Sequence, residues 1–377
     1  MVPDIHGVVE PGFEPVADAF ARNFTVHQEQ GAACTVIIEG ATVIDIYAGE
    51  MAPGQRWDKD TRSAVFSVSK AVTAICLLMA AERGYLDLDA PVVEYWPEFG
   101  AHGKDRITTR QALAHRTGTV AFDEPWGAAD LASWVPVVDS LASQEPLWSP
   151  GSRFAYHPVS VGFLAGEVLR RATGMRPSEW LEKKVCGPLG LRMTYGADEH
   201  DAHLAHIRHP LQPEGAGIPL SAEDSALVTR ALLLDGAYGP DLFAGANSTD
   251  FLGQESPAAN LVTSARDLAR LFSATVHSTQ APRLLSDETL QKALVPLSFG
   301  QPFIGPDKGD VWGTGFMLHS ARRGMAGPGS FGHDGAGGQL AFAHPSLALG
   351  FGFQTVQPGG DDDPRAEELC TALRSAL

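Results

Sequence analysis

Alternating apolar residues predict β-strands near both ends of the chain. Residues 35–38 and 43–47 are β-branched and aromatic runs separated by Glu39-Gly40-Ala41, a pattern typical of a hairpin. In residues 340–353, every second position is large and apolar on either side of a turn at His344-Pro345-Ser346. Both regions are therefore predicted to form antiparallel strands.

Helical patterns dominate between these regions. Thr108 with Gln111 matches a capping box, which starts a helix with Gly118 as its stop. Similar signals predict helices over residues 160–173, 178–187 and 221–236, and leucines at helical spacing predict one over 365–377. We expect this last helix to cover one face of the sheet.

Strands at both ends with helices between them predict an α+β fold. We expect one antiparallel sheet flanked by helices, with a helical domain inserted between the two regions that form the sheet. The expected α/β domain is discontinuous and consists of residues 1–72 and 255–377. The mostly helical domain then covers residues 73–254, and the active site is expected at the interface of the two.

The composition is that of a globular protein with a sizeable core, since 44% of its 377 residues are hydrophobic and 19% are charged. The 28 basic and 45 acidic residues give a net charge of −17, which repels nucleic acid and anionic membrane surfaces, so neither is expected as a partner. The longest uncharged apolar stretch, residues 71–81, is about half of what a bilayer requires. Residues 1–10 lack the features of an export signal, so we expect a cytoplasmic location.

No pattern in the sequence predicts a metal ion or an organic cofactor. The four cysteines are scattered without a CxxC pair and are predicted to be buried free thiols: Cys34, Cys76, Cys186 and Cys370. Histidines recur every third residue at His200, His203, His206 and His209, but without HExxH or a carboxylate triad we favour a surface loop. Residues 327–332 match GxGxxG, yet predicted strands follow where a dinucleotide site requires a helix.

The main chemical signal is Ser67-Val68-Ser69-Lys70 at the start of an apolar helical segment. A serine in the first turn and a lysine three residues later project from the same helix face. The amine can take the hydroxyl proton only if burial or nearby cations lower its pKa from about 10.4. A capping serine followed by a surface lysine would explain an isolated SxxK better. This SxxK motif, however, lies between a β-rich region and a buried helix, which favours the interpretation that Ser67 and Lys70 form a catalytic pair.

Two further segments supply groups for the same chemistry. Tyr156 is the predicted partner of the pair, because a phenol beside an ammonium loses its proton more readily and can then relay protons. The alternative interpretation is that Tyr156 is an aromatic loop residue that only packs on the helical domain. Residues 332–338 are rich in glycine and precede the predicted strands, so a backbone amide there is expected to face a substrate carbonyl. Trp126 and Trp148 lie in loops before Tyr156 and are candidates to line an acyl pocket.

The order of these segments resembles the serine β-lactamase and penicillin-binding-protein fold, in which SxxK precedes YxN or SxN and then KTG. The chain is most similar to the esterases related to class C β-lactamases, the family VIII carboxylesterases. The resemblance extends over residues 20–353 and includes residues 84–89, 113–118 and 264–269. Several motifs in the same order are more specific than any one of them.

The resemblance implies a role for each matching residue. Ser67 corresponds to the nucleophile that forms the acyl-enzyme, Lys70 to its base and Tyr156 to a second acid/base. The backbone amides of Ser67 and Ala336 correspond to the oxyanion hole. No cofactor is implied.

Two departures from the family pattern affect the expected substrate. Tyr156-His157-Pro158 lacks the asparagine that helps to hold the side-chain amide of a β-lactam. His333-Asp334-Gly335 stands where the family has KTG, and His333 and Gly335 are expected to bind the substrate. Histidine is largely neutral near pH 7, so losing the lysine cation should weaken anionic β-lactams more than neutral esters.

We therefore predict a serine carboxylesterase that hydrolyses short-acyl esters through an acyl-enzyme on Ser67. Its expected partner is a small-molecule ester, and a homo-oligomer is compatible with the sequence. Three alternatives stay open. A β-lactamase or D-amino-acid peptidase would use the same three residues, an acyltransferase would capture the acyl group with an alcohol other than water, and a binding protein would have no catalytic serine.

Overall fold

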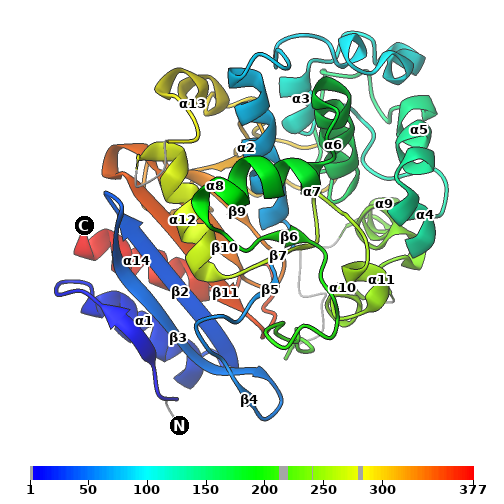
Figure 1. Ribbon diagram of the computed structural model, residues 1–377. Coiled ribbons are helices and arrows are strands. Elements are labelled where there is room, and N and C mark those ends of the chain that lie inside the picture. The colour runs from blue at the N-terminus through cyan, green and yellow to red at the C-terminus, as the bar shows by residue number, and fades with distance from the viewer. Residues whose placement is uncertain (1–2, 212–219, 240, 279–282) are drawn as a thin grey trace.

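An antiparallel sheet assembled from both ends of the chain forms the framework of the molecule (Figure 1). The computed structural model describes residues 3–211, 220–239, 241–278 and 283–377. Within these residues the sheet has eight strands, in the order β1-β3-β2-β11-β10-β9-β8 with β4 paired to β3. The strands are β1 His6–Val9, β2 Gly31–Ile38, β3 Ala41–Ala52, β4 Gln55–Arg56, β8 Met317–Leu318, β9 Phe331–Asp334, β10 Leu340–His344 and β11 Leu349–Thr355.

The pairing of β2 with β11 joins the two ends of the chain, as the alternating patterns predicted. Val36 lies opposite Phe351 and Cys34 opposite Phe353. The predicted N-terminal hairpin is formed by β2 and β3, and both strands are longer than the sequence pattern indicated. The α+β fold class with an antiparallel sheet is therefore confirmed.

Helices cover both faces of this sheet. Helices α1, Glu14–Thr25, and α14, Arg365–Ala376, pack on one face, where Phe351 and Phe353 join their apolar cluster. On the other face lies α12, Ala265–Val276. A Cβ atom on Gly350 would lie 2.2 Å from a carbonyl oxygen of α12, so the small residues of the alternation let this helix approach the sheet closely.

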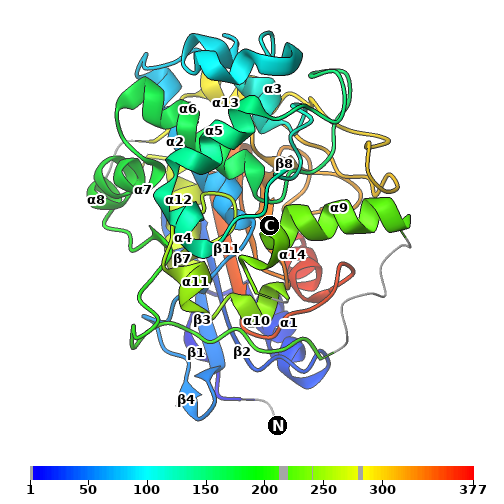
Figure 2. The ribbon, with the colours of Figure 1, turned by 90° about the vertical axis from the view of Figure 1, so that its right-hand side faces the viewer.

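The remaining helices gather beside the sheet, mostly from the middle of the chain (Figure 2). They are α2 Val68–Glu82, η1 Val92–Glu94, η2 Pro97–Gly103, α3 Thr109–Leu113, α4 Ala128–Ser133, α5 Val135–Ser143, α6 Ser160–Thr173, α7 Pro177–Trp180, η3 Leu181–Cys186, α8 Gly187–Leu189, α9 Ala222–Leu233, η4 Leu234–Gly236, α10 Leu242–Gly245, α11 Thr249–Leu252, α13 Asp287–Ala293 and η5 Pro345–Leu347. A second sheet consists of β5 Ser63–Ala64, β7 Leu261–Thr263 and β6 Thr194–Tyr195. Helix α2 contacts both β9 and α6, and so lies between the main sheet and the other helices.

Helix ends are where the sequence predictions and the structure differ. The capping box of Thr108 and Gln111 is present, but α3 ends at Leu113, well before the predicted stop at Gly118, because His115 turns the chain with a φ of +64°. The segment predicted for residues 178–187 starts at Pro177 and stays helical through α8, ending at Gly190 with its positive φ. The helix opened by Ser221 is confirmed, and it is followed by η4.

The buried and exposed positions agree with several smaller predictions. All four cysteines are buried free thiols. The histidines between residues 200 and 209 lie in a segment without a helix, so they share no helix face. Over the described ranges, no helix combines the length and apolar character that crossing a bilayer takes.

Candidate active site

Ser67 stands at the junction between the small sheet and α2. The preceding residue, Phe66, has a φ of +45°, which for an aromatic residue is a strained conformation that costs about 1–3 kcal/mol. Helix α2 starts immediately after Ser67, and its residues from Val68 to Ala80 are all buried. The buried helix therefore fixes Ser67 at its N-terminus, where backbone amides have no partner within the helix.

Lys70 lies one turn further along α2, and its amine reaches the serine. Its Nζ is 3.0 Å from Ser67 Oγ and donates a hydrogen bond to the Ala258 carbonyl over 2.9 Å. Burial lowers the pKa of Lys70 well below its usual value, and the more distant Asp334 carboxylate opposes this only in part. This lowering favours the neutral form of the amine, and a neutral amine in contact with a hydroxyl is the arrangement that a general base requires.

The carbonyl that holds Lys70 belongs to a tightly bonded loop. The buried Asn260 side chain donates to the carbonyls of Phe251 and Gln254 over 2.7 and 2.8 Å and accepts from the Ser256 N–H over 3.0 Å. The sequence analysis missed this loop, since its contact with Lys70 spans 188 positions and no motif marks it.

Tyr156 completes a cluster of three polar groups, as its hydroxyl donates to Ser67 Oγ over 2.7 Å. Trp312 stacks on its ring at 5.3 Å, His115 meets it edge-on at 5.0 Å, and Lys70 Nζ lies 4.8 Å from the ring centroid. Burial raises the pKa of Tyr156, opposite to the expected loss of its proton, and the negative charges of Asp334 and Asp310 act in the same direction. Tyr156 is thus a phenol that can donate its proton. The sequence analysis did not single out Trp312, and it included His115 only within the motif of residues 113–118.

His157, the middle residue of Tyr156-His157-Pro158, has both ring nitrogens engaged within the protein, and Pro158 stands at the family's asparagine position. Its Nδ1 is 2.6 Å from the Ala155 carbonyl and its Nε2 is 2.8 Å from Thr117 Oγ1. Burial lowers the pKa of His157 to about 4, so the ring is neutral near pH 7. Both nitrogens of this side chain are thus bonded within the protein, so it offers no free polar group to a ligand.

The backbone at the end of β9 lies against the start of α2. A Cβ atom on Gly335 would be 2.4 Å from the Val65 carbonyl, so only a glycine lets these two segments approach so closely. The Gly335 N–H donates to the Gln339 carbonyl over 2.7 Å. Among the described residues, the N–H groups of Ser67 and Ala336 donate no hydrogen bond. Two free amides on adjoining segments form an arrangement that can stabilise an oxyanion.

His333 lies beside the cluster, at 6.2 Å from the Tyr156 ring and 5.3 Å from Trp312. It is buried, its Nδ1 is 2.6 Å from the Asp334 carbonyl oxygen, and its Nε2 has no partner among the described residues. Burial lowers the pKa of His333, while the charge of Asp334 is matched by an ion pair with Arg323. A neutral imidazole therefore stands where the resembling family has a lysine cation.

The two tryptophans expected at an acyl pocket both pack against other aromatic rings. Trp126 packs against Phe122, with ring centroids 6.3 Å apart. Trp148 packs edge-on against His157 at 6.1 Å, which puts it on the tyrosine side of the cluster.

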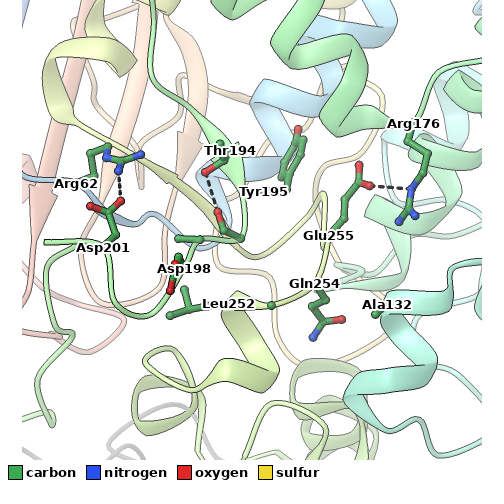
Figure 3. Close-up of a pocket in the computed structure, with 13 residues that line it drawn as sticks. Arg62, Ala132, Arg176, Thr194, Tyr195, Asp198, Asp201, Leu252, Gln254 and Glu255 are labelled. Atoms are coloured by element: carbon green, nitrogen blue, oxygen red, sulfur yellow. Dashed lines mark hydrogen bonds and ion pairs between the residues drawn. The ribbon is translucent and has the colours of Figure 1, made fainter. Parts of the chain in front are cut away.

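A cavity of about 570 Å³ lies apart from the cluster (Figure 3). Two ion pairs line it, Arg62–Asp201 and Arg176–Glu255. Tyr195, also in its lining, meets Thr73 of α2 with its hydroxyl at 2.6 Å. None of Ser67, Lys70 and Tyr156 borders this cavity, so it is separate from the candidate active site.

A serine hydroxyl between a buried lysine amine and a tyrosine phenol, on a helix next to an antiparallel sheet, defines a serine hydrolase of the β-lactamase-like fold. Residues 17–371 match the family model described as Beta-lactamase. The chain therefore belongs to the beta-lactamase family.

Known relatives include both esterases and penicillin-binding proteins. The chain is 31% identical to "Esterase/beta-lactamase LipL" of Mycobacterium tuberculosis, over 92% of this chain and 82% of that protein. A family VIII carboxylesterase structure matches with a TM-score of 0.87 and 30% identity, covering 99% of this chain and all of that one. A penicillin-binding-protein homologue from Caulobacter crescentus matches with a TM-score of 0.88 at the same identity and coverage. These matches support an esterase or β-lactamase-family hydrolase.

Proposed function

We propose that this protein is a carboxylesterase that hydrolyses short-acyl esters through a covalent acyl-enzyme on Ser67. The observation that carries the proposal is the contact of Ser67 Oγ with both Lys70 Nζ and the Tyr156 hydroxyl, at 3.0 and 2.7 Å. The similarity to a family VIII carboxylesterase and to LipL supports the same activity.

Acylation begins when neutral Lys70 accepts the hydroxyl proton as Ser67 Oγ attacks the ester carbonyl carbon. The carbonyl oxygen becomes an oxyanion, which the N–H groups of Ser67 and Ala336 stabilise. The bond to the alcohol oxygen then breaks, and Tyr156 donates its proton to that oxygen. Lys70 returns a proton to Tyr156, so the acyl-enzyme forms with both groups in their resting states and one alcohol released.

Deacylation repeats these steps with water in place of the serine. Lys70 takes a proton from water as the water oxygen attacks the acyl carbon, and the same amides stabilise the second oxyanion. The bond to Ser67 Oγ breaks, Lys70 gives the proton taken from water to Oγ, and the carboxylic acid leaves. Ester and water are thereby converted into acid and alcohol, with the protein unchanged.

Two side chains favour esters over β-lactams. Pro158 stands where the family's YxN element has its asparagine, and a proline side chain has no polar group that could hold a lactam side-chain amide. His333 is neutral because burial lowers its pKa, so it cannot replace the lysine cation that attracts a substrate carboxylate. An ester also releases an alkoxide more readily than an amide releases an amine.

β-Lactam hydrolysis is the second candidate, because LipL, a relative of this protein, is named both esterase and β-lactamase. The test is to compare kcat/KM for p-nitrophenyl acetate and for a chromogenic cephalosporin, with mass spectrometry of the trapped intermediate. We expect the ester to be the better substrate and the acyl group to be on Ser67. In the Ser67→Ala variant, we expect ester turnover to be lost while the circular dichroism spectrum is retained. A faster cephalosporin reaction, or a Ser67→Ala variant that keeps most of its activity, would contradict the proposal.

A further inference from the structure

An aromatic path leads from Tyr156 to the surface of the protein. His157 follows Tyr156 in the chain, Trp148 packs edge-on against His157, and Phe303 packs on Trp148 with ring centroids 4.9 Å apart. Trp148 is only 7% exposed, whereas Phe303 is 37% and the adjacent Leu147 43% exposed. We call Leu147, Trp148 and Phe303 the aromatic rim. A buried aromatic next to Tyr156 is thus continuous with exposed apolar surface.

Backbone hydrogen bonds fix this rim relative to Tyr156. The Phe303 N–H donates to the carbonyl of Phe154, two residues before Tyr156, over 2.7 Å, and the Leu147 N–H donates to the Gly118 carbonyl over 3.0 Å. The Arg153 guanidinium lies over the Phe303 ring at 5.4 Å and further restrains it. Apolar groups held in this way can bind a ligand with little loss of conformational entropy.

The proposed reaction decides which half of an ester meets the rim. Tyr156 donates its proton to the alcohol oxygen, so that oxygen must lie within hydrogen-bond distance of the phenol. The carbonyl oxygen is directed instead to the amides of Ser67 and Ala336. Groups attached to the alcohol oxygen therefore extend past Tyr156, on the side where Trp148 packs against His157.

We propose that the aromatic rim is the subsite for the alcohol half of the substrate and selects esters of apolar alcohols the size of a ring or a short alkyl chain. This proposal rests on the esterase function proposed above and specifies its substrate class. It also reassigns Trp148, which the sequence suggested for an acyl pocket, to the alcohol side. The rim removes apolar substrate surface from water, which favours such alcohols over small polar ones.

The test compares two matched ester series on the full-length protein. In the first, the acyl group is always acetyl and the alcohol is ethanol, butanol or benzyl alcohol. In the second, the alcohol is always ethanol and the acyl group is acetyl, butyryl or phenylacetyl. Phe303→Ala removes exposed ring surface of the rim, and Phe303→Leu keeps an apolar side chain there. Val135→Ala on α5 is the control, since Val135 is an apolar residue 53% exposed and lies outside the rim.

We expect kcat/KM of the wild type to rise from ethyl to benzyl acetate. In Phe303→Ala, the ratio of kcat/KM for benzyl over ethyl acetate should fall roughly tenfold, mostly through KM, which is the scale of one apolar pocket contact. Phe303→Leu should keep most of the ratio, and Val135→Ala all of it. An unchanged ratio in Phe303→Ala, or a ratio that falls only in the acyl series, would overturn the rim assignment and leave the esterase proposal standing. If the wild type hydrolyses no ester of either series, it is the proposed function that fails.

Discussion

Replacing Gly335 with alanine tests the proposed oxyanion hole without removing any polar group from the protein. The new methyl carbon would lie 2.4 Å from the Val65 carbonyl oxygen and 3.0 Å from the Gln339 Cβ. Gly335 has no positive φ, so alanine fits its backbone conformation and the clash is purely steric. Because the closest atom belongs to the backbone, no side-chain rotation can relieve it.

The size of the displacement follows from these distances. Ordinary contact for a Cβ begins at 3.4 Å, so the end of β9 must move about 1 Å away from the start of α2. This shift carries the Ala336 N–H away from Ser67. Loss of one oxyanion donor costs about 100-fold to 1,000-fold in kcat. The overpacking itself should destabilise the fold by about 1–3 kcal/mol, which is less than the usual stability of native proteins, about 5–15 kcal/mol.

The assay measures kcat and KM for p-nitrophenyl acetate together with the unfolding temperature of each variant. Gly360→Ala is the matched control, since a Cβ at Gly360 meets nothing within 4 Å and its φ is not positive. We expect Gly335→Ala to lose kcat by about two orders of magnitude with a small change in KM. The control should retain its activity.

A folded Gly335→Ala variant with kcat close to that of the wild type would refute the reasoning. It would mean that the Ala336 amide does not stabilise the transition state, or that the two segments separate without affecting Ser67. A variant that loses activity only because it is unfolded would be recognised by its circular dichroism spectrum. In that case the loss of kcat is tested in an Ala336→Pro variant, which removes the N–H itself.

Two further predictions concern charge. Burial lowers the pKa of Lys70, and only the neutral amine can act as a base, so kcat/KM should rise as the pH passes through that lowered pKa. It should then stay level, because burial raises the pKa of Tyr156 and keeps the phenol protonated. A kcat/KM that falls between about pH 6 and pH 9 would argue against a neutral base. The Glu167 side chain is fully buried and accepts hydrogen bonds from Trp134, Arg170 and Arg171. Glu167→Ala should therefore lower the free energy of unfolding, measured in urea, by about 3 kcal/mol, as expected for a broken buried ion pair. Equal stability of Glu167→Ala and wild type would show that solvent replaces these bonds.

Local patterns in the sequence were sufficient for the secondary structure that lies near the site. The alternation in residues 340–353 predicted β10 and β11, and the capping residues Thr108 and Ser221 marked helix starts correctly. Helix ends were less predictable. Gly118 does not end its helix, because the positive φ of His115 turns the chain earlier. Gly187 does not end its helix either, because η3 continues from α7 and packs on it. Helix α1 was not predicted from the sequence, although it packs beside α14 on the sheet.

The sequence by itself determined that Ser67 and Lys70 share a helix face, because residues three apart in a helix must do so whatever surrounds them. The sequence also contains, in the family's order, the motifs by which the chain resembles its relatives. Only the tertiary structure decided the protonation states, since the pKa of Lys70 and of Tyr156 depend on burial by segments far away in the chain. The carbonyl of Ala258 and the ring of Trp312 reach the site through long-range packing. Desolvation depends on the whole fold, and no short stretch of sequence records it.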